Sequence, residues 1–208
     1  MGWGRNVQTN GVFMMKTAIT DGWYIWEPNY FTPEQSDAYF GSFLAQLPWR
    51  GGEVQLFGKT FQIPRKQVYF ADEGKAYSYS GKSLHLEPWN NEVNEIKEKL
   101  NQDLGHHFNA CLANLYRDGN DSNGWHSDDE KELGINPMIA SLSFGTTRDF
   151  QLKHKTTDER LNFELTHGSL LVMGGEMQHH WKHQIPKRKG VHEPRVNLTF
   201  RKITSPKP

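Results

Sequence analysis

The stretch "RVNLTFR" (195–201) alternates polar and apolar side chains, which is typical of a β-strand with two different faces. One face carries Arg195, Asn197, Thr199 and Arg201, and the other carries the three apolar residues. Guanidinium groups bind carboxylates through paired hydrogen bonds, so a small dicarboxylic acid would satisfy two arginines on one face. The alternative is an exposed strand face on which both arginines are solvated.

Five further strand-like runs precede this stretch in the second half of the chain. They are "ACLANLY" (110–116), "MIASLSF" (138–144), "DFQLKH" (149–154), "LNFELT" (161–166) and "SLLVMG" (169–174). Turn residues separate the runs, and the segment from Arg148 to Thr166 is predicted to form a hairpin across "TTDER". Many short strands that follow earlier helices indicate an α+β chain built on an antiparallel barrel or sandwich.

The first half of the chain predicts two helices. A helix over 32–47 begins with Thr32 as its N-cap, and Gln35 can complete a capping box. A second helix covers 90–104, where apolar residues recur on one face. The remaining expectations are an entry strand over 22–31, a hairpin over 53–63 around a Phe-Gly-Lys turn, and poor order over about 1–20.

The composition limits the class of protein. A length of 208 residues with 36% hydrophobic residues indicates one soluble globular domain. No apolar run approaches the roughly 18 residues of a membrane span, and we expect no signal peptide. The single Cys111 cannot form an internal disulfide, which favours an intracellular location, cytoplasmic in a bacterium or nuclear in a eukaryote. The net charge of zero excludes a basic field over the whole molecule, although residues 182–208 hold eight Lys or Arg and one acid.

A candidate metal site lies in "NGWHSDDE" (123–130). If this stretch is extended, His126, Asp128 and Glu130 point to one side, and an imidazole beside a carboxylate can hold a divalent metal. One more histidine would complete a two-His-one-carboxylate triad with open positions, which suits non-heme Fe(II). The candidates for that third ligand are His179, His180 and His183, and spacing alone does not choose among them.

Two polar residues precede this segment. Asn114 and Tyr116 share a face of the predicted strand 110–116 by alternation. Both side chains could hydrogen-bond the same dicarboxylic acid as the arginines. An ordinary strand pair with a half-buried tyrosine is the alternative.

Taken together, these pieces resemble a known family. The order Asn-x-Tyr, His-x-Asp, His-x-x-Pro and Arg-x-Asn-x-Thr-x-Arg resembles that of the AlkB-like Fe(II)/2-oxoglutarate-dependent nucleic-acid dealkylases. The resemblance extends over about 22–203. "VQLFGK", "IPRKQVYF", "AYSYSG" and "HSDDE" look like the eukaryotic-type branch that prefers duplex DNA. One departure is Tyr79, where that branch often has phenylalanine.

The resemblance implies a fold and a set of ligands. One domain over 1–208 would contain a double-stranded β-helix (jelly-roll) core at 110–203 and a nucleotide-recognition lid at 50–82. Fe(II) would be bound by His126, Asp128 and His183, the last chosen by its place before "QIP". Arg195 would hold the distal carboxylate of 2-oxoglutarate, and Arg201 would help to fix the end that chelates iron. The pocket would be completed by Asn114, Tyr116, Asn197 and Thr199.

The resemblance also implies an activity. Molecular oxygen and 2-oxoglutarate would be consumed to give succinate and carbon dioxide, and a methyl group on 1-methyladenine or 3-methylcytosine in DNA would leave as formaldehyde. The protein would act as a monomer on duplex or single-stranded DNA, without a membrane partner. The alternatives are the same chemistry on RNA or on a protein, and a catalytically silent DNA-binding module.

The lid residues are those expected to receive a base that has left the duplex. Tyr77 and Tyr79 would form aromatic walls, although an ordinary sheet face is the alternative, and Glu130 would contact the exocyclic amino group. The hairpin tip would insert into the duplex, or else form a packed core corner; it comprises Leu56, Phe57 and Gly58. Arg65 is expected to contact a phosphate.

Overall fold

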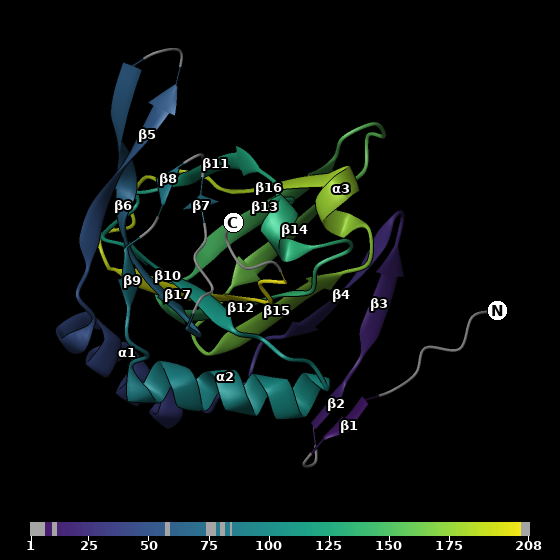
Figure 1. Cartoon of the computed structure of the whole chain (residues 1–208), viewed down its shortest axis with the longest axis horizontal. Helices are drawn as coiled ribbons and strands as arrows, with labels where there is room; N and C mark the ends of the chain where they lie inside the picture. The colour runs from purple at the N-terminus through teal and green to yellow at the C-terminus, as the bar shows by residue number, and fades with distance from the viewer. Residues whose placement is uncertain are drawn as a thin grey trace.

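The computed structural model describes residues 7–9, 12–56, 59–73, 78–79, 82–83 and 85–204. Its centre is a pair of mainly antiparallel sheets (Figure 1). The large sheet has the order β3 (Lys16–Ile19), β4 (Gly22–Glu27), β15 (Ser169–Gly174), β12 (Ile139–Gly145), β17 (Arg195–Arg201), β10 (Ala110–Tyr116), β6 (Lys59–Ala71) and β5 (Arg50–Leu56), and β9 (Leu86–Glu87) pairs with β6. The small sheet has the order β11 (Asn123–His126), β16 (Trp181–Ile185), β13 (Arg148–His154) and β14 (Arg160–Leu165).

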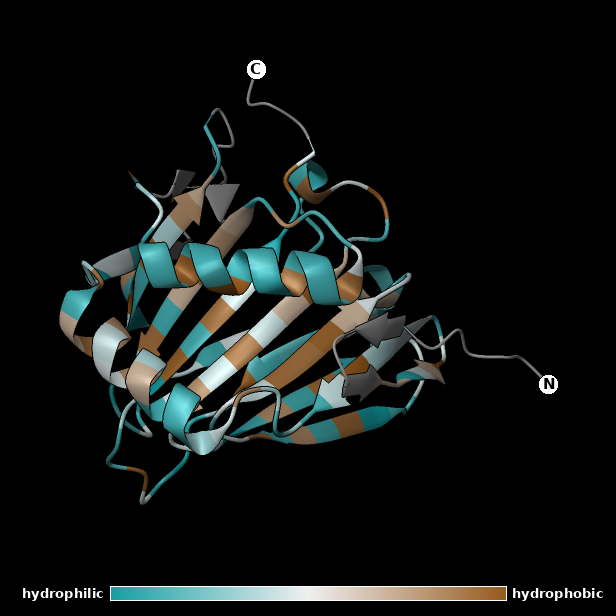
Figure 2. Cartoon of the chain, turned by 90° about the horizontal axis from the view of Figure 1, so that it is seen from below, coloured by the Kyte–Doolittle hydropathy of each residue, from teal (hydrophilic) through white to brown (hydrophobic). Residues whose placement is uncertain are grey.

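The remaining elements lie around these sheets. Two short pairs are β1 (Val7–Thr9) with β2 (Val12–Met14), and β7 (Ser78–Tyr79) with β8 (Lys82–Ser83). The helices are α1 (Pro33–Gln46), α2 (Asn91–Leu104), α3 (Met177–His180) and the 3-10 turn η1 (Lys131–Leu133). Figure 2 shows α1 and α2 lying across the same face of the large sheet. Within the described ranges, no helix is both long enough and apolar enough to cross a membrane.

The alternation along β17 divides the interior into two parts. Val196, Leu198 and Phe200 are fully buried in the apolar core under the two long helices, together with residues such as Phe43 and Ile96. The polar residues of the same strand face the small sheet. The face predicted to be polar is therefore buried as well, and the alternative of a solvated strand face is wrong.

The helix predictions are confirmed to within one residue. Thr32 caps α1, because its Oγ1 accepts from Gln35 N at 3.3 Å while Gln35 Oε1 accepts from Thr32 N at 3.0 Å. Asn90 caps α2 from outside, so this helix begins at Asn91. Gly105 caps its C-terminal end, with a φ of 58° that is a left-handed conformation and suits glycine.

Two hairpins were predicted, and both are present. β13 and β14 pair with Arg148 opposite Leu165. β5 and β6 pair as far as Leu56 opposite Lys59, but β6 continues to Ala71 and becomes a strand of the large sheet. The sequence prediction, which stopped at residue 63, ended this strand too early.

The expectation of poor order over about 1–20 is wrong for its last part. Lys16–Ile19 forms β3, which pairs with β4 in continuous register, and Met14 is only 2% exposed. The signal was weak because β3 is an edge strand with one packed face, so its apolar pattern is sparse. Residues 1–6 and 10–11 lie outside the described residues.

A buried hydrogen-bonded group joins α2 to the loop after β4. Tyr30 Oη donates to Asp103 Oδ2 at 2.7 Å, and Lys99 Nζ lies 2.7 Å from the same oxygen, while Asp103 is only 4% exposed. Tyr30→Phe is expected to lower the free energy of unfolding by about 1.5–3 kcal/mol, because a hydrogen bond to a buried charge is lost. Urea unfolding measures this change.

The matched control is Tyr39→Phe. Tyr39 packs against Phe31 and Phe43, but its hydroxyl makes no hydrogen bond to a described residue. This substitution should shift the free energy of unfolding by less than about 0.5 kcal/mol. Equal losses in the two variants would show that the Tyr30–Asp103 bond is not what stabilises this region.

Candidate functional site

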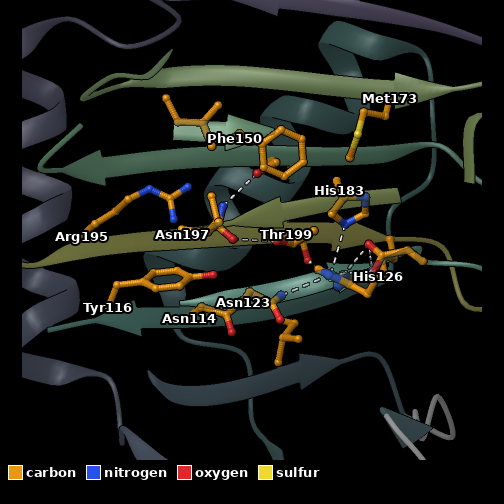
Figure 3. A pocket seen from close by; sticks show the side chains of 16 residues that line it. Asn114, Tyr116, Asn123, His126, Phe150, Met173, His183, Arg195, Asn197 and Thr199 are labelled. Atoms are coloured by element: carbon orange, nitrogen blue, oxygen red, sulfur yellow. Dashed lines mark hydrogen bonds and ion pairs between the residues drawn. The ribbon is translucent and has the colours of Figure 1, made fainter. Parts of the chain in front are cut away.

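Three metal-ligating side chains converge at the rim of the small sheet. His126 ends β11 and stands opposite His183 of β16 in the strand register. The ligand atoms of His126, Asp128 and His183 all lie within 4.8 Å of one another. His126 Nε2 lies 3.1 Å from His183 Nε2 and 3.8 Å from Asp128 Oδ1, and Figure 3 shows the two rings meeting at one end of a pocket.

The way Asp128 reaches this group differs from the expectation. The strand ends at His126, so residues 127–130 lie outside it. Two hydrogen bonds hold the segment that carries the carboxylate: Ser127 Oγ donates to the Trp181 carbonyl at 2.8 Å, and Gln178 Oε1 accepts from Asp128 N at 3.0 Å. Glu130, which was predicted by alternation to face the metal, is not among the residues that line the pocket. Its backbone precedes η1.

The two oxygens of Asp128 have different environments. Oδ2 accepts from Arg201 Nη2 at 2.7 Å and from Nε at 3.2 Å. Oδ1 is buried and makes no hydrogen bond to a described residue. Burial raises the pKa of this carboxyl group, but Arg201 and the two histidines outweigh burial and hold the pKa at about 2. An ionised oxygen with unused lone pairs therefore faces the histidines, as a metal ligand requires.

The tautomer of His126 also suits a metal. His126 Nδ1 lies 2.7 Å from the Gly124 carbonyl, which can only accept, so Nδ1 carries the proton and Nε2 keeps a lone pair. Burial lowers the pKa of His126, and burial with His126 nearby lowers the pKa of His183 to about 3. Both rings are neutral. Two nitrogens bound at about 2.1 Å, at right angles on one ion, would lie roughly 3.0 Å apart, close to the separation found here.

A second cluster has the same residue types, but one of its histidines has a tautomer that does not suit a metal. Asp21, His154 and His180 also bring their polar atoms together. However, His154 Nδ1 accepts from Thr157 N at 3.1 Å and from Thr156 N at 3.3 Å, so its Nε2 carries the proton and donates to Asp21 Oδ2 at 3.0 Å. This nitrogen is not available to a metal. The cluster ties the β3–β4 turn to the small sheet and removes His180 from the list of candidate ligands.

A buried pocket extends from the three ligands between the two sheets. Sixteen residues line it: Leu112, Asn114, Tyr116, Asn123, His126, Asp128, Ser141, Phe150, Leu165, Met173, His183, Ile185, Arg195, Asn197, Thr199 and Arg201. The polar ones come mainly from the large sheet, where Tyr116 stands opposite Arg195 and Asn114 opposite Asn197. Figure 3 shows Arg195 and Tyr116 at the end away from the histidines.

Arg195 is a buried cation with unused donors. It is 1% exposed, and only Nη2 makes a hydrogen bond among the described residues, to Ser143 Oγ at 2.9 Å. Nε and Nη1 are buried without a hydrogen-bond partner in the same residues. Burial lowers the pKa of Arg195 to about 10, which leaves it charged at neutral pH. A buried guanidinium beside a pocket that keeps unused N–H donors is a site for a carboxylate.

Comparison with known proteins assigns the family. A model of the 2OG-Fe(II) oxygenase superfamily matches residues 24–201. The chain belongs to this superfamily. Fe(II), 2-oxoglutarate and oxygen, which the sequence predicted as cofactor and co-substrates, follow from that membership. The three converging ligands fit the metal, and the pocket that ends at Arg195 fits the acid.

Individual relatives agree with the family assignment. Over 178 residues the chain is 42% identical to a protein from Bos taurus named DNA oxidative demethylase ALKBH2, and 43% identical to its Mus musculus counterpart. Each alignment covers 82% of this chain, but only 62% of the bovine and 72% of the murine protein. The chain is also 37% identical, over 186 residues, to a Homo sapiens protein named alpha-ketoglutarate-dependent dioxygenase alkB homolog 3, covering 85% of this chain and 64% of that protein.

A solved structure supports the fold alone. An oxidoreductase of the 2OG-Fe(II) oxygenase family from Burkholderia pseudomallei matches with a TM-score of 0.57 at 13% identity. The match covers 86% of this chain and 84% of that one. The jelly-roll class predicted from the sequence is thereby confirmed.

The other residues predicted to bind 2-oxoglutarate mainly make hydrogen bonds to protein groups in the wall of the pocket. Asn197 Nδ2 donates to Ser141 Oγ and to the Leu142 carbonyl, each at 2.8 Å, and Asn197 Oδ1 accepts from Thr199 Oγ1. Arg201 directs two donors at Asp128, so its main contact is with a predicted iron ligand. Arg201 also lines the pocket, and direct contact with 2-oxoglutarate stays a prediction.

The predicted lid is only partly placed. Leu56 ends β5 and Tyr79 ends β7, whereas Phe57, Gly58 and Tyr77 lie outside the described residues. Arg65 is not at the surface as a phosphate contact would require, because it is 4% exposed and donates to Asn114 Oδ1 and to the Ser122 carbonyl. Arg65 is stable in the interior because Asn114 and Ser122 provide hydrogen-bond acceptors for its guanidinium there.

Sequence reasoning missed three supporting residues. Ser141 and Ser143 of β12 stand opposite Thr199 and Asn197, and they bond Asn197 and Arg195. Their alternation in "MIASLSF" was a usable signal, since both serines fall on one strand face. Gln178, which holds the backbone of Asp128, gave no such signal because it reaches the site from α3.

Proposed function

We propose that this protein is a dioxygenase that uses Fe(II) and 2-oxoglutarate to remove methyl groups from alkylated bases in DNA. The observation that carries the proposal is the pairing of two unsatisfied groups in one buried pocket. Asp128 Oδ1 lacks a donor or metal at one end, and the Arg195 guanidinium lacks a carboxylate at the other. A metal and a dicarboxylic acid would satisfy both. The DNA substrate is supported by the names of the relatives.

Different residues of the pocket would bind the metal and the co-substrate. His126, Asp128 and His183 would hold the iron, and Arg195 would bind the carboxylate of 2-oxoglutarate that lies away from it. The metal and co-substrate, when bound, supply the oxidation by O2, while the protein supplies position and a dry pocket. One oxygen atom of O2 enters succinate as carbon dioxide leaves. The other converts the N-methyl group to a hydroxymethyl group, which breaks down to formaldehyde and the unmodified base.

The substrate must leave the helix to react. A methyl group on the pairing edge of 1-methyladenine or 3-methylcytosine cannot be reached inside a duplex, so the base would be flipped or already single-stranded. The β5–β6 hairpin, which extends beyond the core in Figure 1, is the element we propose to face the nucleic acid. We further propose that the protein acts inside the cell as a monomer.

An oligonucleotide panel tests this function. The iron-loaded protein should release formaldehyde from duplex and single-stranded DNA that carries 1-methyladenine or 3-methylcytosine, with one succinate for each formaldehyde. Omitting 2-oxoglutarate should abolish the release. Methylated RNA and a methylated peptide serve as competing substrates. Turnover of the RNA or the peptide without turnover of DNA would overturn the proposed substrate. If no methylated substrate in the panel were turned over, the proposed activity would be overturned.

A further inference from the structure

Two side chains of β6 converge on a single oxygen atom of the pocket wall. Arg65 Nε donates to Asn114 Oδ1 at 3.0 Å, and Gln67 Nε2 donates to the same oxygen at 2.9 Å. Arg65 is 4% exposed and Gln67 is 7% exposed, so neither bond is open to solvent. Gln67 stands directly opposite Asn114 in the β6–β10 register. This buried contact links the strand of the projecting hairpin to a strand of the pocket.

The arginine fixes which way the Asn114 amide points. An amide can usually be turned over without contradiction, because its oxygen and nitrogen are similar in size. Arginine, however, can only donate, so the atom that faces Arg65 must be the amide oxygen. The NH2 group of Asn114 therefore points away from β6, on the residue that lines the pocket beside Tyr116 (Figure 3). Among the described residues, no acceptor is bonded to this NH2 group.

Arg65 also holds the opposite wall. Its Nη1 donates to the Ser122 carbonyl at 3.2 Å, and Ser122 N donates to the Pro64 carbonyl at 2.9 Å. Ser122 immediately precedes β11, the strand that ends with His126. One short segment of β6 is thus bonded both to the strand of Asn114 and to the strand of the predicted iron ligand.

We propose that Arg65 and Gln67 are positioning residues that turn the Asn114 NH2 group toward bound 2-oxoglutarate. The co-substrate at pH 7 has carboxylate and keto oxygens and no donor, so an NH2 group attracts it and an amide oxygen repels it. Arg65 and Gln67 themselves need not touch the acid. This inference rests on the proposed function for the identity of the co-substrate, and it assigns Arg65 a role in place of the phosphate contact.

Asn114→Asp tests the orientation most sharply. The two side chains have nearly the same shape, and a carboxylate still accepts from Arg65 and Gln67. It places a negative oxygen where the NH2 group stood. The dissociation constant of 2-oxoglutarate, measured by calorimetry in Mn(II)-loaded protein without oxygen, should rise at least about 100-fold. The urea midpoint should stay near that of the unmodified protein. Unchanged affinity would mean that the oxygen of Asn114 already faces the pocket and would overturn the proposal.

Arg65→Met tests the residue that sets the orientation. Without Arg65 only Gln67 faces the Asn114 amide, and because a glutamine amide can itself turn over and accept, the Asn114 orientation is no longer fixed; the dissociation constant of 2-oxoglutarate should rise about 10-fold. Arg65→Lys, which restores a donor, should recover part of that loss. Arg160→Met is the matched control, because Arg160 is an exposed residue of β14, and it should leave the affinity unchanged. An equal effect of both methionine variants would contradict a specific role for Arg65.

The two proposals fail in different ways. If the unmodified Mn(II)-loaded protein does not bind 2-oxoglutarate, the proposed function fails. If it binds, and the Asn114→Asp and Arg65→Met variants bind equally well, only the positioning role fails. Should Arg65→Met not fold, Asn114→Asp decides the question alone.

Discussion

Asp128→Asn is expected to abolish metal binding and formaldehyde release. The substitution replaces the ionised oxygen that faces His126 and His183 with part of a neutral amide. Loss of a second-layer partner alone weakens metal binding about 10–100-fold, so loss of a ligand should exceed 100-fold. Anaerobic Fe(II) titration and the formaldehyde assay measure the two effects.

The same substitution should also destabilise the metal-free protein. Arg201 is 5% exposed and directs two donors at Asp128, so removing the carboxylate charge leaves a buried cation poorly compensated. Breaking one partner of a buried ion pair typically costs about 3–5 kcal/mol, and we expect roughly 3 kcal/mol because the asparagine oxygen can still accept.

Asp21→Asn is the matched control for Asp128→Asn. It makes the same change in the cluster with His154 and His180, whose protonation does not suit a metal. Asp21 has a φ of 53°, a conformation that asparagine tolerates well, so the backbone should not be strained. Metal affinity should be unchanged. If Asp21→Asn lost metal binding while Asp128→Asn retained it, the metal would lie in the cluster with His154 and His180, and the assignment would be contradicted.

Arg195→Met should have two effects of opposite sign. Binding of 2-oxoglutarate should weaken at least about 30-fold, because truncating a buried charged partner costs about 2–5 kcal/mol. The metal-free protein should become more stable, because the substitution removes a buried cation whose Nε and Nη1 make no hydrogen bond in the described part of the chain. A gain of about 1–3 kcal/mol is expected from urea unfolding.

Arg148→Met provides the contrasting control for Arg195→Met. Arg148 is equally buried, but it donates to the carbonyls of Asp118, Asp121 and Pro186. Its removal should lower the free energy of unfolding by about 2–4 kcal/mol, because several buried acceptors lose their donor. If Arg195→Met destabilised the protein to the same extent and still bound 2-oxoglutarate, the pocket would not be an acid site.

The features that the sequence predicted correctly depend on local patterns. Alternation over 195–201 placed four polar side chains on one face, and the structure has all four in the pocket. The cap at Thr32 predicted the start of α1 because the bonds that form it lie within four residues. Such features need no knowledge of the neighbouring strands.

The parts that failed depend on contacts between distant segments. The sequence did not show what holds Asp128, because Gln178 and the Trp181 carbonyl belong to a segment about 50 residues further along the chain. Arg65 looked like a surface cation because the sequence does not show that Asn114 offers it a buried acceptor. Choosing His183 over its neighbours required the resemblance, since spacing does not reveal that it pairs with His126.

The most direct test of the central claim is the location of a bound metal. Crystals of Mn(II)-loaded protein with 2-oxoglutarate should show one anomalous peak that touches His126 Nε2, Asp128 Oδ1 and His183, with a carboxylate of the acid on Arg195. A peak at Asp21, His154 and His180, or no peak at the first cluster, would contradict the assignment.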